Sequence, residues 1–132
     1  MFVSLAWISA PAARIFLPLC VLMLSACGAV GDASAIREAN KHAIACETEA
    51  AFDALDRAAQ AGGMMAEVAG LERVVLLRDA GRMDEAAAAL EARNARAAAD
   101  EAARAEAEAA IEESLEALRD ERQAQTGRRT CS

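Results

Sequence analysis

The chain has few aromatic residues and few of the residues that carry most enzyme chemistry. Its 132 residues include no tyrosine, one tryptophan and three phenylalanines, and Phe52 is the only aromatic residue beyond position 16. Stacking on nucleic-acid bases therefore has almost no side chain to use. His42 is the only histidine, and neither a nucleophile-elbow motif nor a glycine-rich phosphate loop occurs. We therefore expect a non-enzymatic protein without a cofactor, with His42 on a helix surface.

Metal-binding and paired-acid motifs are missing as well. His42 and Cys46 are spaced like two ligands on one helix face, with Asn40 nearby, but two ligands fall short of a metal site and no CxxC motif occurs. Neighbouring acids in a helix point in different directions, so the three adjacent pairs indicate charged surface and not glycosidase acids. These pairs are Asp84 with Glu85, Glu112 with Glu113, and Asp120 with Glu121. No catalytic, cofactor-binding or metal-ligating residue is predicted.

The sequence does contain one strongly apolar segment, near its N-terminus. Residues 15–24 are uncharged and apolar and directly follow Arg14, as in the hydrophobic region of a signal peptide. Arg14 is the only basic residue in this part of the chain, which weakens orientation by positive charge. Two explanations for the missing positive charge are open. The start codon is assigned too early, or residues 1–24 form a membrane-spanning helix, since about 20 apolar residues suffice to span a bilayer. Pro11 and Pro18 argue against the spanning helix.

A four-residue motif closes this apolar segment. The tetrad is Leu24, Ser25, Ala26 and Cys27, and it resembles the lipobox at which bacterial lipoproteins are processed. The resemblance implies that residues 1–26 are a lipoprotein signal peptide and that the Cys27 thiol receives a diacylglyceryl group. Cys27 would then be the lipid-attached first residue of the mature protein, with its amine acylated in turn.

The same resemblance implies a location. Gly28 stands where an Asp would resemble an inner-membrane retention signal. We therefore expect the periplasmic face of the outer membrane, with the inner membrane as the alternative. The membrane partner would be bound through the lipid, because several acyl chains together bind far more tightly than one, at about 0.8 kcal/mol per buried CH₂.

Removal of the signal would leave a small acidic chain. All 21 acidic residues but only 13 of the 14 basic ones lie beyond position 26. An acidic surface argues against nucleic acid and anionic head groups as partners. We expect a tether over residues 27–33, a helical domain over residues 34–125 and a flexible tail over residues 126–132. The core should be thin and made mostly of Ala, Leu, Val and Met.

The mature part predicts an all-α fold, either a helical hairpin or a three-helix arrangement with a long Ala-rich C-terminal helix. Residues 34–60 lack Gly and Pro, and apolar side chains recur there at helical spacing until two adjacent glycines end the helix. A second helix is expected over residues 64–79, which carry the strongest apolar face, and Gly81 ends it. The third is expected over residues 84–125, rich in Ala, Glu and Arg.

The function of the third helix is open between two interpretations. Its Ala-rich part needs little tertiary support, helped by pairs such as Asp100 with Arg104, which favours a solvated spacer over an Ala-lined dimer seam. Further along, an apolar stripe resumes and needs a partner from this chain or from another. The stripe consists of Ile111, Leu115 and Leu118.

One segment resembles the turn and second helix of a tetratricopeptide repeat. The segment comprises Gly81, Arg82, Met83, Asp84, Glu85, Ala86 and Leu90. Thirty-five residues upstream of Ala86, Leu90 and Arg93 stand Ala51, Leu55 and Ala58, which is close to the repeat length of that family. Gly70, Arg73 and Arg93 depart from the pattern of that family. The resemblance implies a helical hairpin and no particular binding residues. The chain also resembles small lipoproteins that pair a lipobox with an Ala-rich terminal helix, which implies an architecture without an activity.

Cys46 and Cys131 remain after processing, in a compartment that is oxidising. A disulfide between them is possible within the chain. It requires the third helix to break near Asn94 or to fold back differently, because an unbroken helix would rise about 60 Å at 1.5 Å per residue. If that helix does not break, the two cysteines either link separate chains or stay reduced.

Together these features predict a lipid-anchored scaffold or interaction protein facing the periplasm, with a protein partner or self-association. The alternative is an accessory lipoprotein of a conjugative plasmid or phage, such as an exclusion protein. Small size, lipidation and a cysteine pair are typical of that class.

Overall fold

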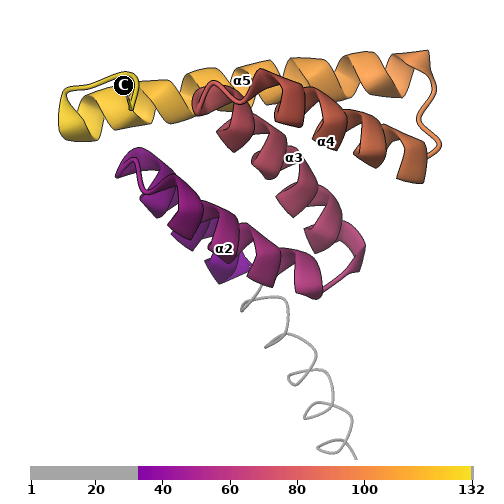
Figure 1. Cartoon of the computed structure of the whole chain (residues 1–132), viewed down its shortest axis with the longest axis horizontal. Helices are drawn as coiled ribbons and strands as arrows, with labels where there is room; N and C mark the ends of the chain where they lie inside the picture. Colours follow the sequence, from indigo (N-terminus) through magenta and orange to yellow (C-terminus); the bar gives the residue numbers. More distant parts are fainter. Residues whose placement is uncertain (1–32, 132) are drawn as a thin grey trace, which may run out of the picture. The chain divides into compact units, whose positions relative to one another are not determined.

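The computed structural model of the chain describes residues 33–131, and this range is all-α (Figure 1). The five helices in it are residues 33–44, α2 (Thr48–Gln60), α3 (Gly63–Asp79), α4 (Met83–Arg96) and α5 (Glu101–Thr126). No strand occurs among these residues. The predicted fold class and the long Ala-rich C-terminal helix are confirmed. Within residues 33–131 no helix combines the length and the apolar content needed to cross a bilayer.

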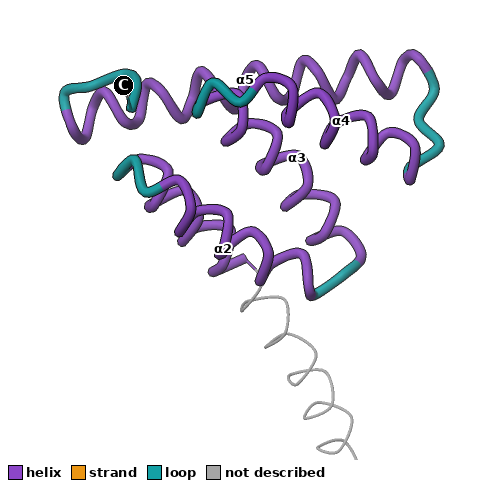
Figure 2. The backbone as a smooth tube through the Cα atoms, in the orientation of Figure 1, coloured by secondary structure: helices purple, strands orange, loops and turns teal. Residues whose placement is uncertain are grey.

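Two of the three expected helices are divided by a turn (Figure 2). The expected helix over residues 34–60 breaks at residues 45–47, and the expected helix over residues 84–125 breaks at residues 97–100. Both predictions of a single helix are therefore wrong.

The two breaks share one cause, a left-handed residue just past the end of a helix. Cys46 has φ 65° and Ala98 has φ 48°. At the first break the Glu47 amide donates to the His42 carbonyl at 2.8 Å, and at the second the Ala99 amide donates to the Asn94 carbonyl at 2.9 Å. These are the hydrogen bonds of the Schellman motif, which usually has glycine at the left-handed position.

Helix α3 lies at the centre of the unit and contacts α2, α4 and α5. In Figure 1 it crosses from the turn after α2 to the turn before α4, and α5 returns across its far end. The C-terminal part of α3 is apolar on every side and is buried over Val74, Val75, Leu76 and Leu77. A helix that is apolar all round requires neighbours all round, which places it in the core.

The core is small and rich in alanine. Its buried alanines lie mainly on residues 33–44 and on α2, where Ala51, Ala54 and Ala58 are fully buried around Leu55. Alanine lets helix backbones approach closely, so a core with one buried aromatic residue, Phe52, still excludes water. Contrary to expectation, no methionine of residues 33–131 is among the buried core residues, and Met64 and Met83 are 80% and 57% exposed.

The Ala-rich segment is folded against the rest of the unit and is not a solvated spacer. Helix α4 packs on α3 and buries Ala86, Leu90 and Asn94. Helix α5 also packs on α3 and buries the stripe of Ile111, Leu115 and Leu118. The partner of this stripe is therefore α3 of the same chain.

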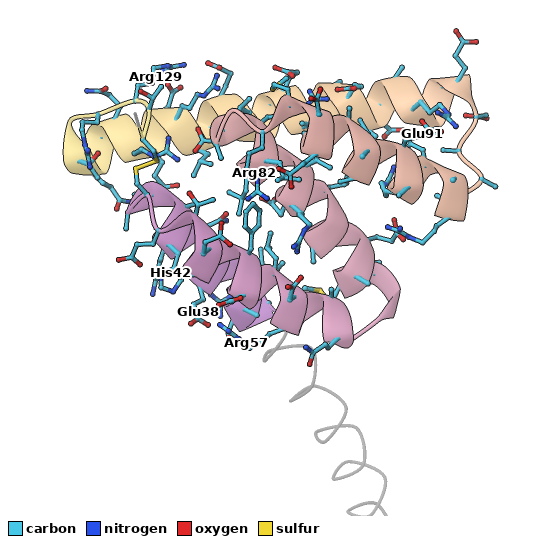
Figure 3. The ribbon with its side chains drawn as sticks, in the orientation of Figure 1. Glu38, His42, Arg57, Arg82, Glu91 and Arg129 are labelled. Atoms are coloured by element: carbon cyan, nitrogen blue, oxygen red, sulfur yellow. A yellow bond between two sulfur atoms is a disulfide. The ribbon has the colours of Figure 1, made fainter. Side chains whose placement is uncertain are left out.

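Ion pairs hold α5 to both neighbouring helices. Arg78 of α3 donates to Glu108 at 2.7 Å and to Glu112 at 2.6 Å, and it is largely buried beneath them. Arg104, near the start of α5, pairs with Glu91 of α4 at 2.8 Å. Glu91 is labelled in Figure 3. The expected pair of Asp100 with Arg104 is absent, because Asp100 caps α5 by accepting a hydrogen bond from the Ala103 amide at 2.9 Å.

Candidate functional site

The structure describes two of the three predicted site residues. Cys27 and the whole lipobox lie outside residues 33–131, so the lipid attachment remains a prediction. The described unit begins close behind this position, with the helix at residues 33–44. Residue 33, the last residue of the expected tether, already belongs to that helix, and the rest of the expected tether lies outside the described residues.

Cys46 and Cys131 form a disulfide within the chain. Their Cα atoms lie 5.4 Å apart, and 85 positions separate them in the sequence. The reversal at residues 97–100 makes this bond possible, since α5 then carries the C-terminus back to the turn that follows residues 33–44 (Figures 1 and 3). The structure thus contains the internal bond, and neither a link between chains nor a pair of reduced thiols.

Beside the disulfide lies a fully buried arginine. Arg122 of α5 has no exposed side chain surface and pairs with Asp79, the last residue of α3, at 2.5 Å and 3.1 Å. It also donates to the Ala43 carbonyl at 3.0 Å and to the Arg129 carbonyl at 3.0 Å. One side chain thus joins four segments: the first helix, α3, α5 and the C-terminal residues.

This arginine was not predicted from the sequence, although a signal was present. Arg122 follows Leu118 by four residues and therefore continues the stripe of Ile111, Leu115 and Leu118 on the same helix face. A charged residue in such a register is usually assigned to the surface because burial of an unpaired charge is costly. The charge that compensates it is on Asp79, which is 43 residues away, and the carbonyls of Ala43 and Arg129 accept its remaining hydrogen bonds.

The C-terminal residues expected to be a free tail are tied to α5. Helix α5 ends at Gly127, a left-handed residue with φ 74°. Arg129 then pairs with Asp120 and Glu116 (Arg129 is labelled in Figure 3), and this contact raises the pKa of its guanidinium further. Cys131 completes the attachment through the disulfide.

His42 is only partly exposed and lies in a group of charged side chains. Figure 3 labels it together with Glu38 and Arg57. Its Nδ1 atom is 2.5 Å from Glu47, and Glu38 pairs with Arg57 of α2 at 2.9 Å. The hydrogen bond and charge of Arg57 lower the pKa of the Glu38 carboxyl. Across residues 33–131, no three His, Cys, Asp or Glu side chains gather where they could hold a metal ion.

Two arginines cover Phe52 at a surface depression of about 290 Å³ between α2, α3 and α4. The guanidinium carbons of Arg73 and Arg82 lie 5.0 Å and 5.3 Å from the ring centroid. Both are already paired, Arg73 with Asp56 at 2.6 Å and Arg82 with Glu85 at 2.6 Å. The arginines therefore stabilise the hairpins around Phe52 by cation–π contact and offer little free positive charge to an anion.

A second surface depression lies between α3 and α5. Val68, Leu71, Val75 and Ile111 line an apolar depression of about 90 Å³, and Glu72 stands at its edge. Burial raises the pKa of the Glu72 carboxyl. Among the residues that the structure describes, Glu72 has no hydrogen bond or ion pair. Chemically, this surface offers apolar area next to an uncompensated carboxylate.

These sites are linked by one core, since Arg122 and Asp79 hold together the helices that also form the α3–α5 surface. None of them assembles a nucleophile with a general base, because His42 contacts carboxylates only. No family model matches the chain, and no match was found among curated proteins or among solved structures.

Proposed function

We propose that the protein is a bacterial envelope lipoprotein, anchored through Cys27, whose helical unit is a non-enzymatic scaffold or interaction module. The tetrad ending in Cys27 behind the apolar run of residues 15–24 is the observation that carries this proposal. Gly28 favours the periplasmic face of the outer membrane. The lipid would localise the protein, and the helices would act on a partner in the periplasm.

One property of the helical unit supports an extracytoplasmic location. It is the Cys46–Cys131 disulfide, since disulfides persist in oxidising compartments. In the sequence, the first described helix begins six residues after Cys27. A lipid-anchored module of this kind would work close to the membrane surface.

Metabolic labelling with an alkyne analogue of palmitate tests the anchor. The wild-type protein should take up the label, and Cys27→Ala should lose it and accumulate as a longer, unprocessed chain. Cys20→Ala is the matched control, because Leu19 before Cys20 does not fit a lipobox; this variant should label like the wild type. Labelling that survives Cys27→Ala, or its absence from the wild type, would refute the lipoprotein assignment.

A further inference from the structure

Three surface depressions join into one groove along α5. The apolar depression shares Glu72 and Ser114 with a second of about 160 Å³ that extends to Glu121. It shares Leu71 and Ala110 with a third of about 330 Å³ that extends to Ala103. We call this continuous surface the α3–α5 groove.

The dimensions of the groove suit an elongated occupant. It follows one flank of α5 from Ala103 to Glu121, which is about 27 Å at 1.5 Å per residue. The side chains that α5 presents along it are mostly small, including Ala103, Ala110, Ser114 and Ala117. Small side chains permit the close approach of another helix, and the wall of Val68 and Leu71 provides the apolar contact that such a helix needs.

The negative charge of the groove favours a positively charged occupant. Its acidic members Glu72 and Glu106 have no ion pair among residues 33–131, and Glu121 accepts a hydrogen bond only from the neutral Gln125. The one basic side chain that lines it, Arg93, is paired with Glu67 at 3.4 Å. The groove is therefore negative along its whole length.

The opposite flank of α5 differs in this respect. There Glu108 and Glu112 pair with Arg78, and Glu116 pairs with Arg119 and Arg129. Three carboxylates of the opposite flank are therefore neutralised, whereas Glu72, Glu106 and Glu121 in the groove have no cationic partner among residues 33–131. Partial burial makes the Glu72 carboxylate costly to keep charged, and a cation brought next to it would relieve that cost.

We propose that the α3–α5 groove binds a basic amphipathic helix of a partner protein. Apolar side chains of that helix would pack against Val68, Leu71 and Ile111, and one of its Lys or Arg side chains would pair with Glu72. This deepens the interaction role proposed above and rests on it. A second copy of this chain is a poorer fit, because its own surface is acidic and like charges would meet in the groove.

A direct binding assay with a defined probe tests the groove. The protein is the unit of residues 31–132, which is compact and contains its own core and disulfide. The probe is a fluorescein-labelled peptide of about five helical turns, with Leu and Ala on one face and Lys on the other. A second peptide carries Glu in place of every Lys. Anisotropy titrations at physiological salt should show saturable binding of one Lys peptide per chain and none of the Glu peptide.

Three variants locate the binding. Glu72→Gln should weaken it about tenfold, and the exposed Ala110→Arg should abolish it by adding bulk and positive charge to the groove. Asp84→Asn is the matched control, since it removes one exposed acid on α4 outside the groove and should bind within about twofold of wild type. Cooperative thermal unfolding checks that every variant is folded.

The proposal is overturned if the Lys peptide does not bind, if the Glu peptide binds equally, or if Asp84→Asn weakens binding as much as Glu72→Gln. It is also overturned if sedimentation shows a wild-type dimer that Ala110→Arg dissociates, because the occupant is then a second copy. Palmitate labelling is independent of these variants, so failure of the groove and failure of the lipid anchor are distinguished.

Discussion

Ala98 ends α4 in a backbone conformation that L-residues rarely adopt. Its φ of 48° is left-handed, which costs a residue with a Cβ atom about 1–2 kcal/mol relative to glycine. The tertiary contacts of α4 and α5 maintain this conformation, because the turn at residues 97–100 must reverse the chain for α5 to reach α3. The left-handed conformation of Ala98 therefore lowers the free energy of unfolding by a small amount.

Replacing Ala98 by glycine should stabilise the protein. Part of the relief is offset by the greater freedom of glycine in the unfolded chain, so we expect a gain of about 0.5–1 kcal/mol in the free energy of unfolding. Urea denaturation followed by circular dichroism measures it. Ala97→Gly is the matched control: Ala97 has an ordinary helical φ of −78°, and glycine there should destabilise by about 0.5–1 kcal/mol. Equal effects of the two substitutions would contradict the assignment of strain to Ala98.

Glu72 gives the fold a pH dependence opposite to that of a salt-bridged acid. Its pKa is raised above the ordinary 4.5 because burial disfavours the carboxylate. The folded state therefore holds this proton more tightly than the unfolded state, and stability falls as the pH rises from 4.5 through the raised pKa. Above that pKa the penalty is constant.

The measurement is the free energy of unfolding of wild type and Glu72→Gln across this pH range. Glutamine should remove this contribution, so the variant should be the more stable one at neutral pH and its advantage should shrink towards pH 4.5. Asp84→Asn should not reproduce the effect, since Asp84 is exposed. An advantage of Glu72→Gln that grows on acidification would have the wrong sign for a buried, unpaired carboxyl.

At the scale of the element, one buried ion pair contributes to the attachment of α5. Arg122→Met should destabilise by about 3–5 kcal/mol, because it leaves Asp79 buried with only the longer contact to Arg119 at 3.6 Å. The double variant Arg122→Met with Asp79→Leu should regain much of this loss, since two apolar groups replace two charges. Chemical denaturation of the single and double variants forms the cycle. A double variant whose loss equals the sum of the two single losses would mean that the pair does not act as a unit.

Arg128→Met is the control for the loss of a positive charge near the end of α5. Arg128 is exposed and follows the helix, so its replacement should change the free energy of unfolding by no more than about 0.5 kcal/mol. A loss comparable to that of Arg122→Met would point to the net charge of the C-terminal segment and not to the buried pair.

The helices also show which parts of this fold can be predicted from sequence. The two expected ends that the structure retains are marked by Gly62 and Gly81, whose left-handed φ of 74° and 72° glycine adopts without strain. Periodicity predicts neither break, and the one at Ala98 was expected only as the condition for an internal disulfide. At Cys46 and Ala98 the left-handed conformation is adopted by residues that have no intrinsic preference for it. Long-range packing and the disulfide maintain these two left-handed conformations. Neither of these causes can be predicted from helical periodicity.

The candidate sites divide in the same way. The sequence identified Cys46 and Cys131 as possible disulfide partners. The length of the expected third helix also showed that this bond requires a break in that helix. The sequence could not identify Arg122, because the carboxylate that allows its burial lies on another helix. Likewise the α3–α5 groove arises from the crossing of two helices, so each of its residues is unremarkable in its own segment.

At the scale of the whole described unit, the chain is closed near its two ends. The disulfide joins the turn after the first helix to the residues after the last one, and Arg122 reinforces the same junction through Ala43 and Arg129. The helices between them therefore form one loop. Such closure suits a unit with a thin Ala-rich core, because the crosslink limits the freedom of the unfolded chain.

Breaking this loop should cost more than any single surface change. For a loop of this length the chain-entropy relation gives a loss of about 4–5 kcal/mol in Cys131→Ser, and dithiothreitol should lower the stability of the wild type equally. Cys46→Gly should lose about 1 kcal/mol less than Cys46→Ser, because glycine relieves the left-handed φ of 65° while both remove the bond. Denaturation with and without reductant measures these differences. Non-reducing electrophoresis should show the oxidised wild type as a monomer, whereas a dimer band that is lost in either cysteine variant would assign the bond to two chains and remove the closed loop.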